Sequence, residues 1–223
     1  MLVVNPAYEA VTEDWFDPDY WAQRARPVSS GGRGSAWFVE ADQGDMVLRH
    51  YRRGGMVARI SERRYLYTGE SRARSNREFQ LLETLHRQGL PVPEPVAAWS
   101  AREGGLWYRA AILIRRIESA VALPDATDPM DVDLWHDVGR TIRRFHDAGL
   151  NHVDLNCDNI LVAEGQIYLI DFDRCRLTPG VCLSSKTALR NLDRLKRSVN
   201  KRFPEKVREP CWPHLLSGYQ AST

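Results

Sequence analysis

Long apolar runs are absent from this sequence of 223 residues. No window approaches the roughly twenty consecutive apolar residues that a membrane-spanning helix needs. The first residues, Met1 to Asp14, include acids and no apolar stretch typical of a signal peptide. These two absences predict a protein that stays in the cytoplasm. The apolar fraction of 43% is ordinary for a globular chain and suffices for one large domain or two small lobes.

Cysteine is scarce, and no two cysteines form a CxxC pair. The spacing therefore predicts neither a zinc site nor a disulfide framework. The four cysteines are Cys157, Cys175, Cys182 and Cys211. We expect Cys157 to fill space in its loop without chemistry of its own.

Lysine is missing from the first 185 residues. The four lysines, Lys186, Lys196, Lys201 and Lys206, all follow them. Any cation that the front part of the chain offers to a phosphate must therefore be an arginine. The planar fork of arginine binds phosphate oxygens in pairs, whereas lysine acts as a point charge.

The net charge is only +2, but the basic residues are clustered. Residues 49–77 contain nine arginines and two acids, and residues 186–208 contain nine basic residues and two acids. Such clusters usually form a solvated face. They also suit an anionic partner, which here means a phosphorylated substrate, a nucleic acid or a membrane surface.

Three polar residues near the middle of the chain carry the most information. Asn159 follows Asp154 by five residues, and Asp171 follows Asp154 by seventeen. Phosphoryl transfer to a hydroxyl group needs a carboxylate that orients the hydroxyl and accepts its proton, and oxygen ligands that hold magnesium against the ATP phosphates. Asp154 suits the first role, and Asn159 and Asp171 suit the second.

Two short apolar runs separate Asn159 from Asp171. Residues 160–162 and 167–170 read as strands, and Glu164-Gly165-Gln166 lies between them as a turn. A hairpin at this place would bring Asn159 and Asp171 close together in space. The spacing and this local context together make the pattern specific.

The first half of the chain predicts strands at residues 36–40, 46–51, 96–99 and 108–114. A glycine-rich segment, residues 30–35, precedes them and would let backbone N–H groups approach a phosphate. Residues 1–27 read as an arm or short helix packed on the domain, and residues 52–74 as a basic insertion. Residues 115–118 read as a hinge between two lobes.

Residues 75–88 predict a helix whose inner face carries Phe79, Leu82, Leu85 and His86. Glu78 has two interpretations in this helix. It forms a capping box with Ser75, or it pairs with the cation at Arg49.

Two further helices are predicted in the second half. Residues 131–148 carry an apolar stripe and end at Gly149, which suits the left-handed C-terminal position. Residues 190–202 form a basic helix, for which we expect four inward side chains: Leu189, Leu192, Leu195 and Val199.

This order of elements resembles the protein-kinase-like superfamily over roughly residues 28–175. The resemblance implies an α+β, bilobal protein-kinase-like fold with a small antiparallel-sheet N-lobe and a short, mainly helical C-lobe. We assign the N-terminal arm to residues 1–27, the N-lobe to 28–116 and the C-lobe to 117–223. Asn156 stands where a protein kinase has lysine, Asp173 replaces the glycine of Asp-Phe-Gly, and the tail is short.

The chain is more closely similar to the bacterial 3-deoxy-D-manno-octulosonic acid (Kdo) kinases of the lipopolysaccharide core kinase family. The motifs that carry this similarity are Gly31-Gly32-Arg33-Gly34-Ser35, Leu48-Arg49-His50-Tyr51-Arg52-Arg53-Gly54-Gly55, Arg77-Glu78-Phe79, Pro91-Val92-Pro93-Glu94-Pro95, His152-Val153-Asp154-Leu155-Asn156 and Ile170-Asp171-Phe172-Asp173. The resemblance implies ATP-dependent phosphorylation of the 4-hydroxyl of a Kdo residue on a lipid A precursor. It also implies peripheral work at the cytoplasmic face of the inner membrane, with no nucleic-acid partner, and leaves the oligomeric state open.

The resemblance also implies a role for each site residue. Asp154 is the catalytic carboxylate, and Asn159 and Asp171 bind Mg²⁺. The residues expected at the ATP phosphates are Gly31, Gly32, Arg33, Gly34, Ser35, Arg49 and Glu78. Arg52 and Arg53 are expected at the anionic substrate.

Several alternatives stay open at this point. His152 either holds the loop through the backbone near Asp171 or acts on substrate. Asp173 is either a second metal ligand or a polar loop residue, and Asp158 is expected to be a turn residue. Rival functions are an aminoglycoside- or choline-type kinase of the same superfamily, a protein kinase, and a pseudokinase that only binds.

Overall fold

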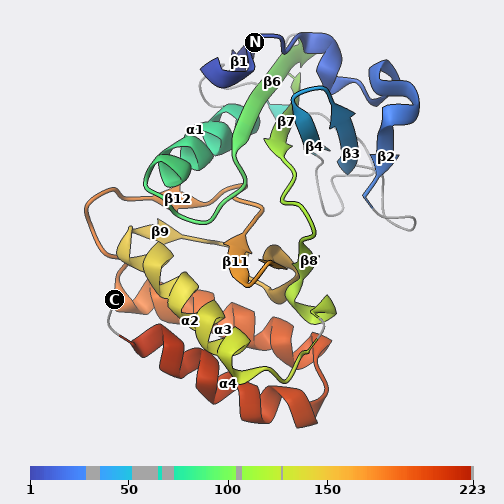
Figure 1. Ribbon diagram of the computed structural model, residues 1–223. Coiled ribbons are helices and arrows are strands. Elements are labelled where there is room, and N and C mark those ends of the chain that lie inside the picture. Colours follow the sequence, from blue (N-terminus) through green and yellow to red (C-terminus); the bar gives the residue numbers. More distant parts are fainter. Residues whose placement is uncertain (29–35, 52–64, 67–72, 104–106, 127, 222–223) are drawn as a thin grey trace. The chain divides into compact units, whose positions relative to one another are not determined.

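The computed structural model describes residues 1–28, 36–51, 65–66, 73–103, 107–126 and 128–221 (Figure 1). The chain forms two compact units. Met1–Thr84 and Pro93–Arg116 make the first unit, and Leu85–Val92 and Ile117–Thr223 make the second. The predicted glycine-rich phosphate loop, Gly31, Gly32, Arg33, Gly34 and Ser35, and the predicted substrate contacts Arg52 and Arg53 lie outside the described residues.

The first unit is built on an antiparallel sheet. Seven strands are found in the described part of this unit, in the order β1-β6-β7-β4-β3-β2, with β5 paired to β7. Their bounds are β1 Leu2–Val4, β2 Ala25–Pro27, β3 Ala36–Ala41, β4 Gly44–His50, β5 Tyr65–Leu66, β6 Pro95–Glu103 and β7 Trp107–Arg115. The four strands that the sequence predicts correspond to β3, β4, β6 and β7.

The N-terminal segment contributes more than the arm that its sequence suggests. β1 pairs with β6, β2 pairs with β3, and both extend the sheet. Three 3-10 helices, η1 (Pro6–Tyr8), η2 (Glu13–Phe16) and η3 (Pro18–Arg24), connect these strands. Trp15, Phe16 and Trp21 are buried against the strand residues Met46 and Leu48. Burial of these large aromatic side chains stabilises the segment on the sheet.

Helix α1 (Arg74–Arg87) follows the basic insertion. Phe79, Leu82 and Leu85 are buried, as their helical spacing predicts. His86 is exposed, so its predicted place on the inner face is wrong. It lies in the last turn, where it lines a cavity rather than the core.

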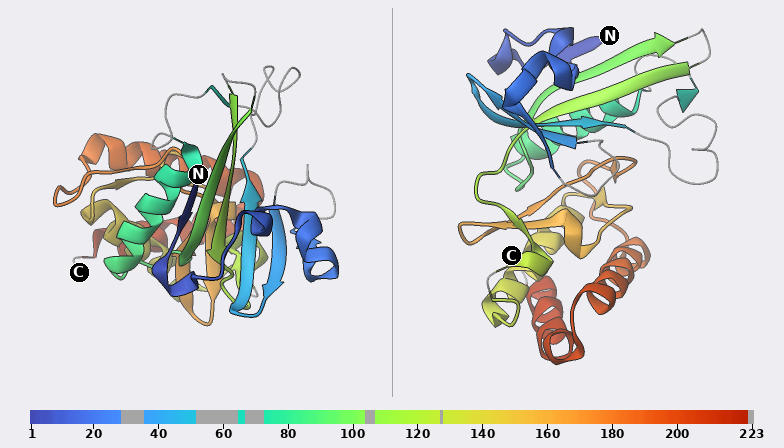
Figure 2. Two further views of the ribbon diagram at one scale, coloured as in Figure 1. Left: turned by 90° about the horizontal axis from the view of Figure 1, so that it is seen from above. Right: turned by 90° about the vertical axis from the view of Figure 1, so that its right-hand side faces the viewer.

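The second unit combines three helices with short strands (Figure 2). The helices are α2 Val132–Asp147, α3 Ser185–Arg202 and α4 Glu205–Gln220. The strands are β8 Val121–Ala122, β9 Leu150–Asn151, β10 Ile160–Ala163, β11 Gln166–Leu169 and β12 Arg176–Leu177. Two 3-10 helices, η6 Leu123–Asp125 and η7 Cys157–Asn159, complete the described elements of this unit.

Helix α2 begins and ends as its sequence predicts. The Asp131 side chain accepts hydrogen bonds from Asp133 N and Leu134 N, which satisfies two N–H groups of the first turn. Gly149, with φ +87°, follows the helix in the left-handed conformation that glycine adopts without strain.

Helix α3 buries a different stripe from the predicted one. Leu192, Leu195 and Val199 are buried as expected, but Leu189 is 60% exposed and its predicted inward place is wrong. Ala188 takes the inward position instead. Spacings of four, three and four residues connect Ala188, Leu192, Leu195 and Val199, so the phase of the helix selects Ala188 over its larger neighbour.

Helix α4 packs closely on α2, and glycines permit the approach. A Cβ atom on Gly139 of α2 would lie 1.9 Å from the Leu215 carbonyl oxygen. A Cβ atom on Gly218 of α4 would lie 1.9 Å from the His136 carbonyl oxygen. Each helix therefore presents a glycine to the backbone of the other.

A polar network lies between the three helices. His146 of α2 contacts the Tyr219 hydroxyl of α4 at 2.8 Å through Nδ1 and the Asn191 amide of α3 at 3.3 Å through Nε2. Burial lowers the pKa of His146 to about 4, and Asp147 opposes the shift while His152 and Arg143 add to it. His146 is thus neutral in the folded protein at neutral pH.

The low pKa of His146 predicts acid sensitivity. Below the unfolded value of about 6.5, the unfolded chain binds a proton that the folded chain refuses. Stability is therefore complete above that pH and decreases as the pH falls towards the folded pKa of about 4. We expect this group to remove about 2 kcal/mol between pH 7.5 and pH 5, measured by urea unfolding.

Burial lowers the pKa of His152 as well, so both histidines contribute to the pH dependence of wild-type stability. The variant His146→Gln separates the contribution of His146 from that of His152. The difference in free energy of unfolding between wild type and His146→Gln should shrink as the pH falls. A difference independent of pH would contradict the assignment.

Candidate active site

The loop between β9 and β10 is held by the side chain of Asn156. Its Oδ1 atom accepts hydrogen bonds from Asp158 N at 2.9 Å and Asn159 N at 3.1 Å, which makes Asn156 the N-cap of η7. Its Nδ2 atom donates to the Asp154 carbonyl oxygen at 3.1 Å. One neutral side chain therefore ties together the backbone at the two ends of the predicted motif.

Asn159 is hydrogen-bonded to the same carbonyl group of Asp154. Its Nδ2 atom donates to the Asp154 carbonyl oxygen at 3.0 Å. Because a carbonyl can only accept, the amide nitrogen must face Asp154, and the amide oxygen faces away from it. The Asp154 side chain is partly buried in this loop.

The hairpin that the sequence predicts connects Asn159 to Asp171. β10 and β11 pair antiparallel, and Glu164 (φ +48°) and Gly165 (φ +76°) form the two-residue turn. Ile170 N donates to the Asn159 carbonyl oxygen at 3.0 Å, so Asn159 lies next to the residue that precedes Asp171. The two predicted ligands are thus brought together by local pairing.

The backbone of Asp171 is in a rare conformation. Its φ of +62° lies in the left-handed region, which costs energy for a residue other than glycine. Such strain persists only where the surrounding structure enforces it, and it gathers at functional sites. Asp171 is partly buried and lies two residues after the last residue of β11, Leu169.

The donor types of this pair fit magnesium. Mg²⁺ prefers oxygen ligands and is commonly held in kinases by one or two carboxylates together with substrate phosphates. Asn159 offers its amide oxygen and Asp171 its carboxylate. Within the described ranges, no group of three or more His, Cys, Asp or Glu side chains is arranged so that it could hold a metal ion.

His152 is buried beneath the loop. It is 1% exposed, and its Nε2 atom contacts the Ile170 carbonyl oxygen at 3.1 Å. Burial lowers the pKa of His152, so the ring is neutral and Nε2 carries the proton that it donates. Phe172 packs against the ring with 5.2 Å between centroids. This arrangement favours the structural interpretation of His152 over direct action on substrate.

The first unit holds the other predicted pair. An Arg49 guanidinium nitrogen lies 2.5 Å from both carboxylate oxygens of Glu78, and the Tyr51 hydroxyl donates to Glu78 at 2.5 Å. Glu78 is 4% exposed, and the guanidinium lies 5.1 Å from the Tyr51 ring centroid. Sequence reasoning missed Tyr51, whose position two residues after Arg49 on an extended strand was the available signal.

The alternative capping-box interpretation of Glu78 is wrong. Helix α1 begins at Arg74, so Ser75 lies inside it rather than at its N-cap. The Ser75 hydroxyl donates to the Trp99 carbonyl oxygen at 2.9 Å instead. The Ser75 hydroxyl, which a capping box would need, is therefore bonded to the sheet.

Two residues of the loop, Cys157 and Asp158, contact α3. Asp158 lies in the 3-10 helix η7, where its carboxylate accepts from Arg202 at 2.9 and 3.0 Å. Cys157 is buried, and its Sγ atom lies 2.9 Å from the Ser198 hydroxyl oxygen. Asp173 is partly buried, and both of its interpretations remain open.

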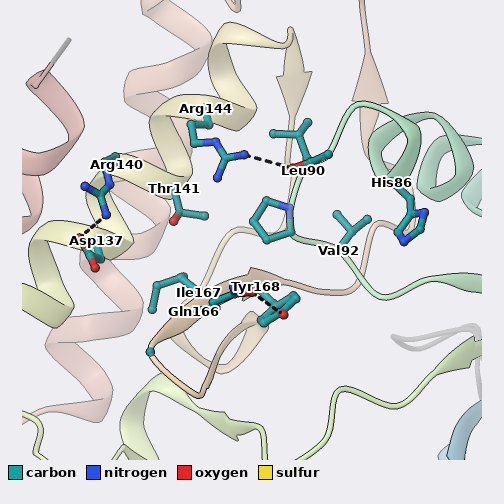
Figure 3. A pocket seen from close by; sticks show the side chains of 13 residues that line it. His86, Leu90, Val92, Asp137, Arg140, Thr141, Arg144, Gln166, Ile167 and Tyr168 are labelled. Carbon is teal, nitrogen blue, oxygen red and sulfur yellow. Dashed lines mark hydrogen bonds and ion pairs between the residues drawn. The ribbon is translucent and has the colours of Figure 1, made fainter. Parts of the chain in front are cut away.

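A cavity of about 440 Å³ lies elsewhere in the second unit (Figure 3). Leu90, Val92 and Ile167 line it together with Arg140 and Arg144 of α2. Both arginines already have partners, Asp137 for Arg140 and the Gly89 carbonyl oxygen for Arg144. Of the predicted site residues that the structure describes, none lines this cavity.

A family model of lipopolysaccharide kinases (Kdo/WaaP) matches residues 18–219. The chain belongs to the lipopolysaccharide kinase (Kdo/WaaP) family. It is therefore a phosphotransferase, as the Asp154, Asn159 and Asp171 spacing predicted. None of the described helices combines the length and the apolar character that crossing a bilayer requires.

Close relatives support this membership of the Kdo/WaaP family. A protein from Stenotrophomonas maltophilia named 3-deoxy-D-manno-octulosonic acid kinase is 50% identical over 190 residues, which cover 83% of this chain and 74% of that protein. A protein of the same name from Xanthomonas campestris pv. campestris is 50% identical over 198 residues, which cover 87% and 77% of the two chains.

Solved structures confirm the kinase-like fold of this family member. WaaP in complex with acyl carrier protein matches with a TM-score of 0.60 at 14% identity, covering 98% of this chain and 88% of that one. An aminoglycoside-3'-phosphotransferase of type VIII matches with a TM-score of 0.57 at 13% identity, covering 89% and 87%. The predicted α+β, protein-kinase-like fold is confirmed.

Asn156 provides a test of how this family member positions its loop. Asn156→Ala removes the N-cap and the donor to Asp154, so we expect a loss of about 1 kcal/mol in stability. Displacement of Asp154 and Asn159 should also lower kcat about 10- to 100-fold, because small misplacements are costly in catalysis. Steady-state kinetics and thermal unfolding measure the two effects.

Asn200→Ala is the matched control, since this asparagine is exposed on α3 and Arg208 donates to its backbone carbonyl oxygen, which the substitution keeps. It should leave kcat and stability nearly unchanged. Full activity in Asn156→Ala would show that the loop keeps its geometry without this side chain.

Proposed function

We propose that this enzyme transfers the γ-phosphoryl group of ATP to the 4-hydroxyl of a Kdo residue linked to a lipid A precursor. The observation that carries the proposal is the loop and hairpin that hold Asp154, Asn159 and Asp171 together. The 50% identity to proteins named as Kdo kinases supports the choice of acceptor.

Asp154 has the role of orienting the sugar hydroxyl and accepting its proton. Asn156 and Asn159 hold its peptide group, so the carboxylate starts from a defined backbone position. Asn159 and Asp171 would hold Mg²⁺, which when bound neutralises charge on the ATP phosphates. His152 supports the backbone carbonyl that precedes Asp171.

Arg49 takes the role that lysine has in most kinases. Glu78 and Tyr51 fix its guanidinium, so that little side-chain freedom is lost when it meets a phosphate. The Gly31–Ser35 loop, with Arg33, is proposed to cover the ATP phosphates. Arg52 and Arg53 are proposed to contact the anionic acceptor.

We propose further that the enzyme works as a peripheral protein at the cytoplasmic face of the inner membrane. The acceptor is a lipid, and ATP is supplied from the cytoplasm. The two basic clusters, at residues 49–77 and 186–208, suit anionic lipid and anionic sugar.

The test is transfer of labelled phosphate from ATP with Mg²⁺ to a Kdo-lipid A precursor, beside an aminoglycoside and a protein acceptor. We expect label in the lipid only, its loss on chelation of the metal, and a phosphate on the 4-position of Kdo by NMR. Transfer to the aminoglycoside instead would keep the kinase and discard the Kdo acceptor. A phosphate at another hydroxyl would correct the position alone.

A further inference from the structure

Helix α3 has two faces of opposite character. Ala188, Leu192, Leu195 and Val199 are buried on one side. Five exposed basic residues recur on the other side with spacings of four, four, three and four: Lys186, Arg190, Arg194, Arg197 and Lys201. This spacing keeps all five within one stripe along the helix, nearly opposite the buried one. We call these five residues the basic face of α3.

Other cations nearby have partners within the protein, which distinguishes them from the basic face. Lys196 lies over the Trp212 ring, Arg202 pairs with Asp158, and Arg208 donates to the Asn200 carbonyl oxygen. Within the described ranges, no ion pair or hydrogen bond involves a side chain of the basic face. Asp193 is the one acid in α3. It lies three residues after Arg190 and four before Arg197, so the face carries five positive charges beside one negative charge. A concentrated net positive charge of this kind attracts an anionic surface.

Exposed apolar side chains occur at the start of the same helix. Leu189 is 60% exposed and lies three residues after Lys186, which makes the two neighbours on the helix surface. Val181, four residues before α3, is 57% exposed. An amphipathic surface with basic residues beside exposed leucine suits the boundary between lipid headgroups and acyl chains. Charge alone would suit any polyanion, so these side chains favour lipid.

We propose that the basic face of α3 docks on an anionic lipid bilayer. The proposal rests on the proposed function in one respect, because a lipid-linked acceptor requires the enzyme to reach a membrane. Binding to lipid itself does not depend on the identity of the acceptor, so the two can fail separately.

The same helix is bonded to the catalytic loop, which gives docking a consequence for catalysis. Ser198 contacts Cys157 through its hydroxyl at 2.9 Å, and Arg202 pairs with Asp158. Both contacts lie within the second unit and join the C-terminal half of α3 to the residues between Asp154 and Asn159. A bilayer that holds α3 therefore also sets the direction from which a membrane-bound hydroxyl meets Asp154.

The first experiment is sedimentation with vesicles of phosphatidylcholine containing about one third phosphatidylglycerol, compared with pure phosphatidylcholine. Each basic residue near an anionic surface contributes about 1 kcal/mol, which is about fivefold in affinity. Arg190→Gln/Arg197→Gln should therefore weaken binding about 25-fold. Added salt should weaken wild-type binding because it screens the charges.

Arg24→Gln/Arg26→Gln is the matched control, because it removes the same net charge at exposed arginines of the first unit. It should bind vesicles like wild type. Equal weakening by both pairs would mean that net charge, not the basic face, drives binding, and would overturn the proposal. Wild type that binds polyglutamate but not anionic vesicles would overturn it in favour of an acidic protein partner.

Kinetics separate docking from chemistry. Arg190→Gln/Arg197→Gln should raise KM for an acceptor embedded in anionic vesicles about as much as it weakens vesicle binding. It should leave kcat and KM unchanged for the same acceptor in neutral detergent. Charge-dependent vesicle binding without transfer to Kdo would sink the proposed function and leave the docking surface standing. If neither Arg190→Gln/Arg197→Gln nor Arg24→Gln/Arg26→Gln changed transfer to the acceptor in vesicles, the proposed function would stand and the docking surface would be overturned.

Discussion

Asp154→Asn should lower kcat by about 10² to 10⁴, with little change in KM for ATP. The amide has nearly the shape of the carboxylate, but it cannot accept a proton from the sugar hydroxyl. Asn156 and Asn159 bind the Asp154 carbonyl oxygen rather than its side chain, so the loop should keep its conformation. The measurement is steady-state transfer to Kdo-lipid A precursor in neutral detergent, with thermal unfolding to show that the variant folds.

Asp158→Asn is the matched control within the same loop. Asp158 is exposed and pairs with Arg202, and exposed ion pairs contribute at most about 1 kcal/mol. In detergent this variant should keep kcat within a few-fold of wild type. If Asp154→Asn retained wild-type turnover, Asp154 would not be the proton acceptor, and another group would have to be sought.

Gly139→Ala should destabilise the protein by about 3 kcal/mol and lower Tm by about 10 °C. Alanine normally stabilises a helix interior relative to glycine by about 1 kcal/mol, so the direction of the change is itself informative. Here the added methyl group would lie 1.9 Å from the Leu215 carbonyl oxygen, and the two helices would have to separate. Gly218→Ala should behave in the same way, because its methyl group would meet the His136 carbonyl oxygen at 1.9 Å.

Ser217→Ala provides the control for this pair, since Ser217 precedes Gly218 and is exposed. Its effect should remain within about 0.5 kcal/mol. A higher Tm for Gly139→Ala would mean that helix propensity outweighs the contact and would contradict close packing of α2 on α4 at this glycine.

The loop that carries Asp154 and Asn159 is the most predictable part of the candidate site. Its residues are close in sequence, and the hairpin between Asn159 and Asp171 needs only local pairing and the turn at Glu164-Gly165. The Arg49–Glu78 contact spans 29 residues, so sequence left two interpretations that only tertiary structure separates. Ser75 faces Trp99 because the sheet lies beside α1, a fact that no local pattern contains.

The C-terminal helices were less predictable for physical reasons. Helix α4 was not predicted, since it contains Pro210 and Pro213, which disfavour a helix interior. Its packing on α2 through glycine compensates for that local preference. In α3, hydrophobicity alone predicts that Leu189 is buried. The rotational position of the helix against its neighbours instead buries Ala188 and exposes Leu189. Asn156 stands where a protein kinase has lysine, but its role as N-cap depends on the backbone angles of the loop.

The outward surface of α3 also makes the protein easy to observe. Lys186, Lys196 and Lys201 lie on α3 and Lys206 on α4, and all four are exposed. The N-terminal amine donates to the Ser100 carbonyl oxygen at 2.6 Å, and no lysine occurs in the first unit. Among side chains, acylating reagents and amine-reactive dyes will therefore mark only lysines of α3 and α4. Mass spectrometry of the acylated peptides then measures whether these two helices are covered, without an engineered label.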